Sequence, residues 1–375
     1  MSKLEELIKE LCPNGVEFKA LEDVIDYEQP SKYIVKNTDY SDRFPTPVLT
    51  AGQTFILGYT NEEDGIYEAN KEKPVIIFDD FTTANKWVDF RFKIKSSAMK
   101  ILTSKDNNKY DIRYLYHVIQ TIRYVPVDHS RQWIGTYSKF TIPVPHPDVQ
   151  CEIVRILDNF TELTAELTAE LTARKKQYEY YRDQLLTFDE SVPSVKLGNI
   201  CDVITGGEVP GECVKGNIPS DDYTYPIWGN GKNIYGYTKS YKVGVDAVCI
   251  SSIGANTGMV YFHKANFTPI VRLKVLIPKN NTINTRYLFH AVSTIKFEAK
   301  KSSVPNMSAG DIKKLSISLP SSKEQERIVS ILDRFDALCN DISVGLPAEI
   351  EARKKQYEYY RDKLLTFKNI DSEAN

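Results

Sequence analysis

The side chains that could do chemistry are few in this chain and lie scattered along it. It has five histidines and six cysteines, and they form neither a Cys-x-x-Cys pair nor a His-Glu-x-x-His motif. The phosphate-binding sequence Gly-x4-Gly-Lys-Ser/Thr, the dinucleotide-binding sequence Gly-x-Gly-x-x-Gly and the nucleophile sequence Gly-x-Ser-x-Gly are also missing. The sequence therefore predicts a chain without catalytic residues, without a metal site and without a cofactor site.

Two pairs of residues are the remaining candidates for metal ligands. Asp79 and Asp80 end an apolar run, where two carboxylates could hold a cation, but no third acidic partner is evident. We therefore interpret them as turn residues. His117 and His290 occupy the same place in two related stretches with helical periodicity. We interpret them as partly buried polar residues of a helix face rather than as ligands.

Composition bounds the class of protein. The chain has 375 residues, of which 42% are apolar and 26% charged, which is ordinary for a folded protein with two or three domains. The six cysteines are too sparse for a disulfide framework and are predicted to be reduced. The first residues have the pattern of an acidic amphipathic helix rather than of a signal peptide, which predicts a cytoplasmic protein. A net charge of −2 means that any DNA-binding surface is a local patch.

An internal repeat organises the chain. Residues 173–188 read Ala-Arg-Lys-Lys-Gln-Tyr-Glu-Tyr-Tyr-Arg-Asp-Gln-Leu-Leu-Thr-Phe, and residues 352–367 repeat them with Lys363 in place of Gln184 as the only change. Shared helix propensity alone does not produce such identity, so the chain contains two copies of one unit. Between these segments the sequences are much less alike. The pattern predicts one duplicated helical scaffold that carries two different globular domains.

Each copy begins with short β-prone runs and one amphipathic helix and ends with a long helical stretch. We therefore predict a mixed α/β fold with an internal pseudo-twofold repeat. The predicted boundaries are an N-terminal helix (1–15), a first globular domain (16–147), a central helical region (148–190), a second globular domain (191–321) and a C-terminal helical region (322–375).

The long helices differ between the copies. In the first copy, residues 148–188 hold a continuous apolar seam that includes a tandem Thr-Ala-Glu-Leu repeat (164–171), with no glycine or proline. A single helix of this length needs a partner helix along its seam, as in a coiled coil. In the second copy, Gly345-Leu-Pro347 is expected to break the helix, because proline lacks a donor and clashes one turn back.

Two surfaces are candidates for binding. The duplicated cationic and aromatic segment favours either the seam between helices or a docking face for a partner, with these candidate residues: Arg174, Lys175, Tyr178, Arg353, Lys354 and Tyr357. Loops that mix cations, amides and aromatics suit contacts to base edges and phosphates. Their candidate DNA-binding residues are Lys86, Trp87, Arg131, Gln132, Trp133 and Tyr137 in the first domain, and Lys232, Asn233, Asn256, Lys300, Ser303, Asn306 and Ser308 in the second.

The order of these parts resembles the specificity subunit of type I restriction–modification systems. The resemblance covers essentially the whole chain, and its most specific carriers are the repeated segment, the Ile-Val-x-Ile-Leu-Asp sequences that end at Asp158 and Asp333, and the Gly254-Ala-Asn-x-Gly258 loop.

The resemblance implies a non-catalytic subunit in which each globular domain is a target-recognition domain that reads half of a bipartite, asymmetric site in double-stranded DNA. The two helical regions would pack antiparallel as a spacer and dock two modification (methyltransferase) subunits. Restriction subunits would join the larger complex. S-adenosylmethionine, ATP and Mg²⁺ would belong to these partners, and no membrane is implied.

Two other readings compete with this one. A protein-interaction scaffold with peptide- or sugar-binding heads agrees with the nearly neutral charge. A self-sufficient nuclease or methyltransferase is disfavoured, because the sequence shows no acidic triad and no cofactor loop.

Overall fold

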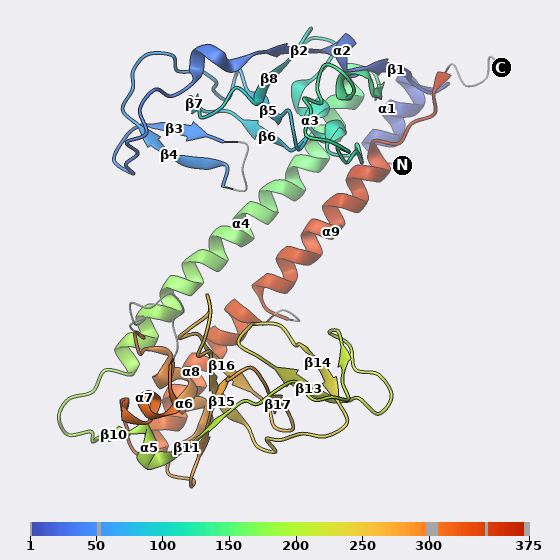
Figure 1. Cartoon of the computed structure of the whole chain (residues 1–375). Helices are drawn as coiled ribbons and strands as arrows, with labels where there is room; N and C mark the ends of the chain where they lie inside the picture. Colours follow the sequence, from blue (N-terminus) through green and yellow to red (C-terminus); the bar gives the residue numbers. More distant parts are fainter. Residues whose placement is uncertain (1, 51–53, 298–306, 342–343, 371–375) are drawn as a thin grey trace. The chain divides into compact units, whose positions relative to one another are not determined.

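The long apolar seam of the first repeat forms one unbroken helix, α4 (Pro147–Leu185). In the second repeat the helical run stops before Gly345-Leu-Pro347, so that α8 (Ser322–Asn340) and α9 (Leu346–Leu364) are separate helices. The predicted difference between the repeats is confirmed. Figure 1 shows the computed structural model, which describes residues 2–50, 54–297, 307–341 and 344–370.

The chain forms two compact units, and each contains residues from both repeats. Unit 1 comprises Met1–Glu166 and Ile350–Asn375, and unit 2 comprises Leu167–Glu349. The first half of α4 and most of α9 thus belong to unit 1, whereas the second half of α4 and all of α8 belong to unit 2.

Unit 1 contains two sheets and a separate strand pair. Its four-stranded sheet has the order β2 (Ile25–Glu28), β8 (Met99–Ser104), β5 (Val75–Asp79), β6 (Asn85–Val88). Its three-stranded sheet has the order β4 (Ile56–Thr60), β3 (Thr46–Leu49), β7 (Lys93–Ile94). The pair is β1 (Glu17–Ala20) with β9 (Thr141–Val144), and the short helices are α1 (Lys3–Leu11), α2 (Leu21–Val24), η1 (Pro30–Tyr33), α3 (Ile112–Ile119) and η2 (Tyr137–Lys139).

Unit 2 repeats this plan. Its first sheet has the order β11 (Cys201–Thr205), β18 (Lys274–Pro278), β15 (Ala247–Ile250), β16 (Val260–His263). Its second sheet has the order β12 (Val214–Lys215), β14 (Gly236–Thr238), β13 (Tyr225–Trp228), β17 (Thr268–Pro269). The strand pair is β10 (Ser194–Lys196) with β19 (Ser316–Ser318), and the short helices are α5 (Leu197–Ile200), α6 (Thr285–Ser293) and α7 (Ala309–Lys314).

The two globular parts share one plan despite their different sequences, although β12 adds a fourth strand to the second sheet of unit 2. We call the sheets of unit 1 together with α3 head 1, and the sheets of unit 2 together with α6 and α7 head 2. In each head the central strand, β5 or β15, pairs antiparallel with both neighbours. In each second sheet one short strand, β7 or β17, pairs parallel. The predicted mixed α/β fold with an internal repeat is therefore present in the structure.

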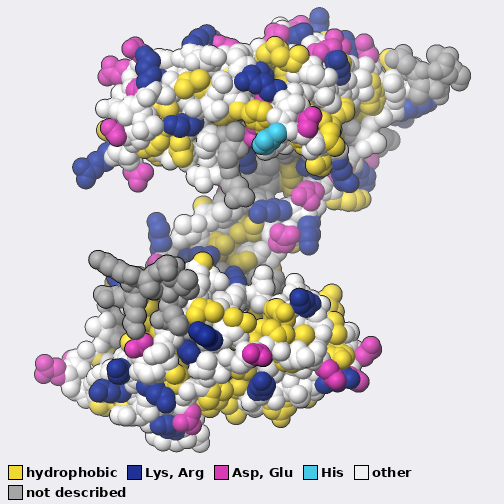
Figure 2. All heavy atoms as spheres, viewed as in Figure 1, with side chains coloured by type: hydrophobic (Ala, Val, Ile, Leu, Met, Phe, Trp, Pro, Cys, Tyr) yellow, Lys and Arg dark blue, Asp and Glu magenta, His cyan; other side chains and the backbone are white. Residues whose placement is uncertain are grey.

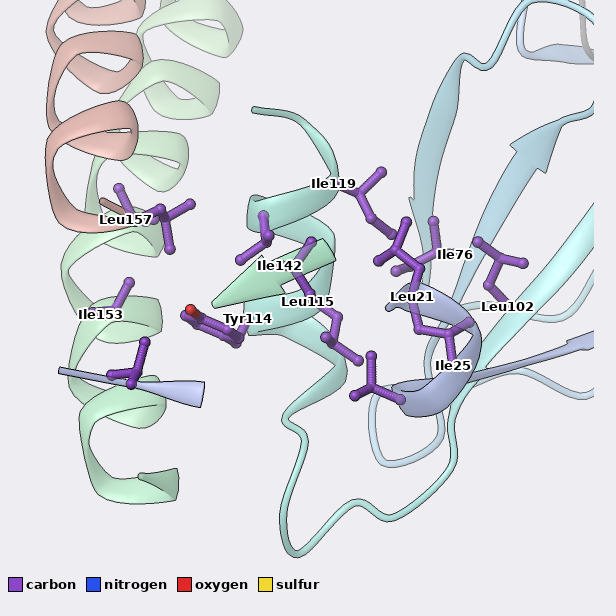
Figure 3. Close-up of a cluster of buried hydrophobic side chains, with 14 of the residues drawn as sticks. Leu21, Ile25, Ile76, Leu102, Tyr114, Leu115, Ile119, Ile142, Ile153 and Leu157 are labelled. Carbon is purple, nitrogen blue, oxygen red and sulfur yellow. The ribbon is translucent and has the colours of Figure 1, made fainter. Parts of the chain in front are cut away.

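Helix α3 lies between the four-stranded sheet and α4 and joins their apolar faces into one core. Figure 3 shows Ile76 and Leu102 reaching it from the sheet and Ile153 and Leu157 from α4. Tyr114 of α3 points toward α4 and donates its hydroxyl hydrogen to the Pro143 carbonyl at 3.0 Å. Head and helix therefore share one hydrophobic core within unit 1, and α6 plays the same part in unit 2.

A buried glutamine fixes the start of α3 and of α6 in the same way. In unit 1 the amide nitrogen of Gln150 donates to the carbonyls of Lys109 and Pro145, both at 2.8 Å, and its oxygen accepts from the Asp111 N–H at 2.9 Å. In unit 2 Gln325 makes the same three contacts, to Thr282, Pro320 and Asn284. Asp111 and Asn284 are the N-cap residues of α3 and α6, so the glutamines satisfy otherwise orphaned backbone groups at both helix starts.

The buried imidazole of His117 fastens α3 to both long helices of unit 1. Its Nε2 lies 3.0 Å from Oδ1 of Asp158 on α4, and its Nδ1 lies 2.9 Å from the hydroxyl of Tyr357 on α9. Arg113 donates to the same carboxylate at 2.8 Å. His117 is a polar residue of a helix face, as interpreted, but it is fully rather than partly buried, with 0% exposure. We call these four residues junction 1.

Junction 2 repeats the arrangement in unit 2. His290, also 0% exposed, lies 2.7 Å from Oδ1 of Asp333 on α8 and 3.1 Å from the hydroxyl of Tyr178 on α4. Arg286 donates to Asp333 at 2.7 Å and to Asp336 at 2.9 Å. In each junction the aspartate belongs to the same repeat as the histidine, but the tyrosine belongs to the other repeat. The Arg-Lys-Lys-Gln-Tyr segment of each copy therefore helps to fasten the head of the other copy.

The charges of junction 1 follow from burial and pairing. Burial lowers the pKa of His117, although the hydrogen bond with Asp158 opposes this effect. Burial alone would raise the pKa of Asp158, but the hydrogen bond with His117 and the charge of Arg113 leave it lowered. Burial raises the pKa of Tyr357 to about 12. A neutral imidazole therefore donates from Nε2 to a carboxylate and accepts the tyrosine hydrogen at Nδ1.

The long helices also contact each other within each unit. In unit 1, α4 and α9 lie side by side and run in opposite directions (Figure 1), and the rings of Phe160 and Tyr360 stack 5.3 Å apart. In unit 2, Phe335 of α8 lies between two tyrosines of α4, with ring centroids 6.5 Å from Tyr178 and 5.6 Å from Tyr181. The predicted partner helices along the seam are thus present.

Replacing Tyr357 by phenylalanine tests junction 1. The variant leaves Nδ1 of the buried imidazole without its donor, and we expect the free energy of unfolding to fall by about 1 kcal/mol. Tyr178→Phe should have the same effect on unit 2. Tyr359→Phe and Tyr180→Phe are matched controls on the same helices, because these rings are 60% and 62% exposed. Urea denaturation measures the difference. Equal stability of Tyr357→Phe and Tyr359→Phe would contradict the role of the junction.

Candidate nucleic-acid interface

In head 2, one asparagine ties three loops together at the ends of the strands. Asn230 follows β13, and its side-chain oxygen accepts from the Ser252 N–H at 2.8 Å and from the Ser251 hydroxyl at 3.2 Å. Its amide nitrogen donates to the Val271 carbonyl, and its own carbonyl accepts from Asn256 at 3.1 Å. The loops after β13, β15 and β17 are therefore held as one surface.

The Gly254-Ala-Asn-Thr-Gly258 loop is a defined turn within this surface. Its two glycines have φ angles of 78° and 90°, in the left-handed region that favours glycine. A Cβ at Gly258 would lie 3.0 Å from the side chain of Phe297. Gly254 and Ala255 are exposed at the tip. The loop therefore offers backbone and small side chains to a ligand that approaches closely.

In head 1 the corresponding loop is built on carboxylates instead. Asp79 accepts from the Phe81 N–H at 3.0 Å and from the Thr82 hydroxyl at 2.6 Å, and Asp80 accepts from the Trp133 N–H at 2.8 Å. This confirms the interpretation of the pair as turn residues. Within the described parts of the chain, no three His, Cys, Asp or Glu side chains are grouped as a metal site would need.

The predicted DNA-binding residues of head 1 divide by burial. Lys86 and Arg131 are exposed. Trp87 is half-buried, with the Arg113 guanidinium 4.5 Å from its ring centroid.

The other three residues predicted for head 1 have buried side chains: Gln132 is 3% exposed, and Trp133 and Tyr137 are each 2% exposed. The Trp133 ring contacts Phe78, with the ring centroids 5.0 Å apart. Gln132 accepts a hydrogen bond from Tyr124 at 2.7 Å. These three side chains form part of the interior of head 1. They are therefore not available to contact DNA as predicted.

The predicted residues of head 2 are placed as follows. Lys232 and Asn233 are exposed next to Asn230. Asn256 is half-buried and holds the loop surface together. Ser308 is the N-cap of α7 and forms a capping box with Asp311. The remaining three predicted residues lie outside the described residues: Lys300, Ser303 and Asn306.

The predicted partner-binding residues also divide into two groups. Tyr178 and Tyr357 face inward to the histidines of the junctions. Arg174 donates to Gln177 at 3.0 Å, and Arg353 donates to Gln356 at 3.1 Å, so the copies match in detail.

Lys175 and Lys354 are exposed. The most exposed rings of the two segments are Tyr180 and Tyr359, which the list of candidate partner-binding residues did not include. Helical periodicity could have found them, because Tyr178 and Tyr180 cannot both lie on one face.

The faces of the two units that Figure 2 shows carry charges of both signs. Figure 2 shows Lys and Arg side chains mixed with Asp and Glu and with apolar side chains over the visible faces of both units. This agrees with the net charge of −2.

Comparison of this sequence and fold with known proteins identifies the class of protein. A family model described as the type I restriction modification DNA specificity domain matches the chain twice, over residues 13–174 and 190–352. The chain belongs to this family and is a non-catalytic DNA specificity subunit of type I restriction–modification systems.

Two relatives match over nearly their whole length. The chain is 44% identical to the "Type I restriction enzyme EcoR124I/EcoR124II specificity subunit" of Escherichia coli, with 100% of both chains covered. It is 30% identical to a putative type I restriction enzyme specificity subunit of Haemophilus influenzae, with 96% of this chain and 98% of that one covered. The crystal structure of the S subunit of a type I restriction–modification system from M. genitalium has the same fold, with a TM-score of 0.63 at 14% identity over 94% of this chain and 96% of that one.

The structure also bears on the cysteines and on membrane-spanning helices. None of the six cysteines is paired with another in the structure. In the described part of the chain, no helix has an apolar stretch long enough to cross a membrane.

Proposed function

We propose that each head reads one half of a bipartite, asymmetric site in double-stranded DNA. The recognition domains are residues 16–147 and 191–321. The N-terminal helix (1–15) packs on the first of them, and the helical regions 148–190 and 322–375 act as spacer and docking surface. One observation carries this proposal: two heads that share one plan are fastened by equivalent junctions to a duplicated scaffold, while their loops differ.

The difference in the loops supports two different half-sites. Head 1 has an Asp79-Asp80 turn closed by the buried Trp133, whereas head 2 has an Asn230 surface with the Gly254–Gly258 loop. Base edges are distinguished by the pattern of donors and acceptors presented to them. Heads with unlike polar groups at the same place in the fold are therefore suited to unlike sequences.

The proposed DNA contacts are exposed polar residues: Lys86 of β6 and Arg131 in head 1, and Lys232 and Asn233 in head 2. Trp87 is half-buried and lies next to Lys86 on β6. Asn256 is half-buried and would position the loop surface of head 2 from behind. Cations fix a protein on the duplex through phosphates, and amides suit adenine edges.

The duplicated helical segment is the proposed docking face for two modification (methyltransferase) subunits. Lys175 and Tyr180 on α4 are exposed, as are Lys354 and Tyr359 on α9. Exposed tyrosines are typical of interface centres. S-adenosylmethionine, ATP and Mg²⁺ would act in the modification and restriction subunits, where the chemistry takes place.

Exchange of a head tests the division of the DNA site. Replacing residues 197–320 with the matching segment of another specificity subunit should change one half of the methylated sequence and leave the other unchanged, because only one reader is altered. Methylation mapping in cells that carry the modification subunits gives the result. A change in both halves would contradict independent reading by the heads.

Insertion of one more Thr-Ala-Glu-Leu unit after residue 171 tests the spacer. Four residues lengthen a helix by about 6 Å and rotate it by about 40° beyond a full turn. We expect the unread spacer between the half-sites to grow by one or two base pairs, given about 3.4 Å of rise for each, while both half-sequences stay the same. A constant spacer with a changed half-sequence would be the opposite outcome.

Substitution of the exposed tyrosines tests the docking face. Tyr180→Ala and Tyr359→Ala should each remove one modification subunit from the complex, and the double variant should remove both, because each side chain lies at the centre of one docking face. Native mass spectrometry reads the stoichiometry. Tyr241→Ala, 47% exposed on head 2, is the control. If Tyr180→Ala, Tyr359→Ala and the double variant all kept both modification subunits, docking would occur on another surface.

A further inference from the structure

Two consecutive residues of head 2 adopt a backbone conformation that their side chains disfavour. Val271 has a φ of 51° and Arg272 a φ of 60°. Left-handed backbone is uncommon for residues other than glycine and is rare for a β-branched residue. Such residues lower the stability of the fold and gather at functional sites. The turn after β17 is therefore maintained against a local preference for another conformation.

The neighbouring strand end holds the backbone of this turn. The Val271 N–H donates to the Gly207 carbonyl at 2.8 Å, and the Arg272 N–H donates to the Gly206 carbonyl at 3.1 Å. A Cβ at Gly206 would lie 2.9 Å from backbone atoms of Ile270. Only glycine permits this close approach, so the Gly206-Gly207 pair and the strained turn form one backbone cluster.

Side chains from the loop surface fix both carbonyls of the turn. Asn230 donates to the Val271 carbonyl, and the Ser252 hydroxyl donates to the Arg272 carbonyl at 2.6 Å. These are the same two residues that join the loops of head 2. Both peptide units of the turn are thus held in place, and the exposed Arg272 side chain starts from a rigid base.

Three cations gather around this cluster. Lys274, only 6% exposed, donates to the Thr205 hydroxyl at 3.1 Å. A Cβ on Gly207 would lie 3.7 Å from Nζ of Lys242. Burial lowers the pKa of Lys274, and the charge of Arg272 lowers it further. Among the described residues, no ion pair joins Arg272, Lys274 or Lys242 to a carboxylate.

Head 1 treats the equivalent lysine differently. Lys100 pairs with Phe78 in the sheet as Lys274 pairs with Ile250 in head 2, so the two lysines occupy the same place. Lys100 lies 3.3 Å from the Asp80 carboxylate and donates to Gln29.

The residue of head 2 that corresponds to Asp80 is Ser252, which has no charge. Head 1 therefore neutralises this buried cation internally, and head 2 does not. Neighbouring like charges in a partly desolvated site are unfavourable unless an anion completes them.

We propose that Arg272, presented by the strained turn and supported by the charge of Lys274, contacts acceptor oxygens of duplex DNA as the central cationic contact of head 2. The inference rests on the proposed function, in which head 2 reads DNA. The acceptor is either a guanine edge or a backbone phosphate, since the guanidinium fork fits both. The backbone that carries the guanidinium is already fixed, so no backbone freedom of the turn is lost on binding.

Arg272→Gly separates contact from folding. Glycine suits a φ of 60°, so the thermal midpoint should equal or exceed that of the unmodified chain. DNA affinity of the complex with modification subunits should nevertheless fall at least about tenfold. Fluorescence anisotropy with a duplex that carries the methylated site measures this at several salt concentrations. Lys274→Met should weaken binding in the same direction but less, because its charge acts on the DNA from behind Arg272.

The pattern of the loss identifies the acceptor. A phosphate contact predicts a uniform loss over all sequences and a salt slope that is smaller by about 1. A guanine contact predicts relaxed preference at one position of one half-site. Arg327→Ala, which removes an exposed arginine paired with Glu324 on α8, is the control for charge and should change affinity less than about twofold.

Unchanged affinity and an unchanged methylated sequence in Arg272→Gly would overturn the inference. The head exchange separates this result from a failure of the proposed function. If that exchange alters one half-site while Arg272→Gly has no effect, head 2 reads DNA through other residues. If the exchange also has no effect, head 2 does not read DNA.

Discussion

The structure depends on a buried imidazole that needs a hydrogen-bond partner on each side. His117 and His290 have no access to water, so both ring nitrogens must be satisfied by the protein. One partner is an aspartate from the helix that follows the head in sequence, and the other is a tyrosine from the opposite repeat. Each head is thereby bonded to two helices at once. A head attached to one helix alone would leave a buried acceptor unpaired.

This constraint explains why the repeats are so unequally alike. A tyrosine of each repeated segment binds the head of the other repeat, so a change at Tyr178 or Tyr357 disturbs a head that is distant in sequence. The glutamines at the helix starts, Gln150 and Gln325, are fixed for a similar reason, because each satisfies three backbone groups of its unit. The loops that carry Asp80 and Ser252 do not supply the hydrogen bonds of the junctions or of the buried glutamines. They can differ, as the Asp80 and Ser252 positions do, without changing the contacts that attach each head to the long helices.

The long helices and the two related units could be predicted from the sequence, because both depend on patterns within short stretches of the chain. The apolar periodicity and Pro347 indicated the extents of α4, α8 and α9. The repeated segment predicted two related units. The exchange of helical segments between units could not be predicted, because a tyrosine and a histidine more than a hundred positions apart leave no local signal. The loop residues were harder still. Trp133 and Tyr137 have the composition of a contact loop but are buried, and nothing in the letters of Val271-Arg272 reveals a positive φ.

A nearly neutral chain is well suited to reading DNA selectively. A strongly basic surface gains affinity by counterion release on any sequence, which raises non-specific binding along with specific binding. Here many scaffold cations are matched by acids on the same helix, as in Arg155 with Glu152 and Arg327 with Glu324. Such pairs add little to stability at an exposed site, but they cancel charge where base recognition does not occur. In the proposed function, a cation without an acidic partner, such as Arg272 on its fixed turn, would then contribute most to DNA binding in the loops of head 2.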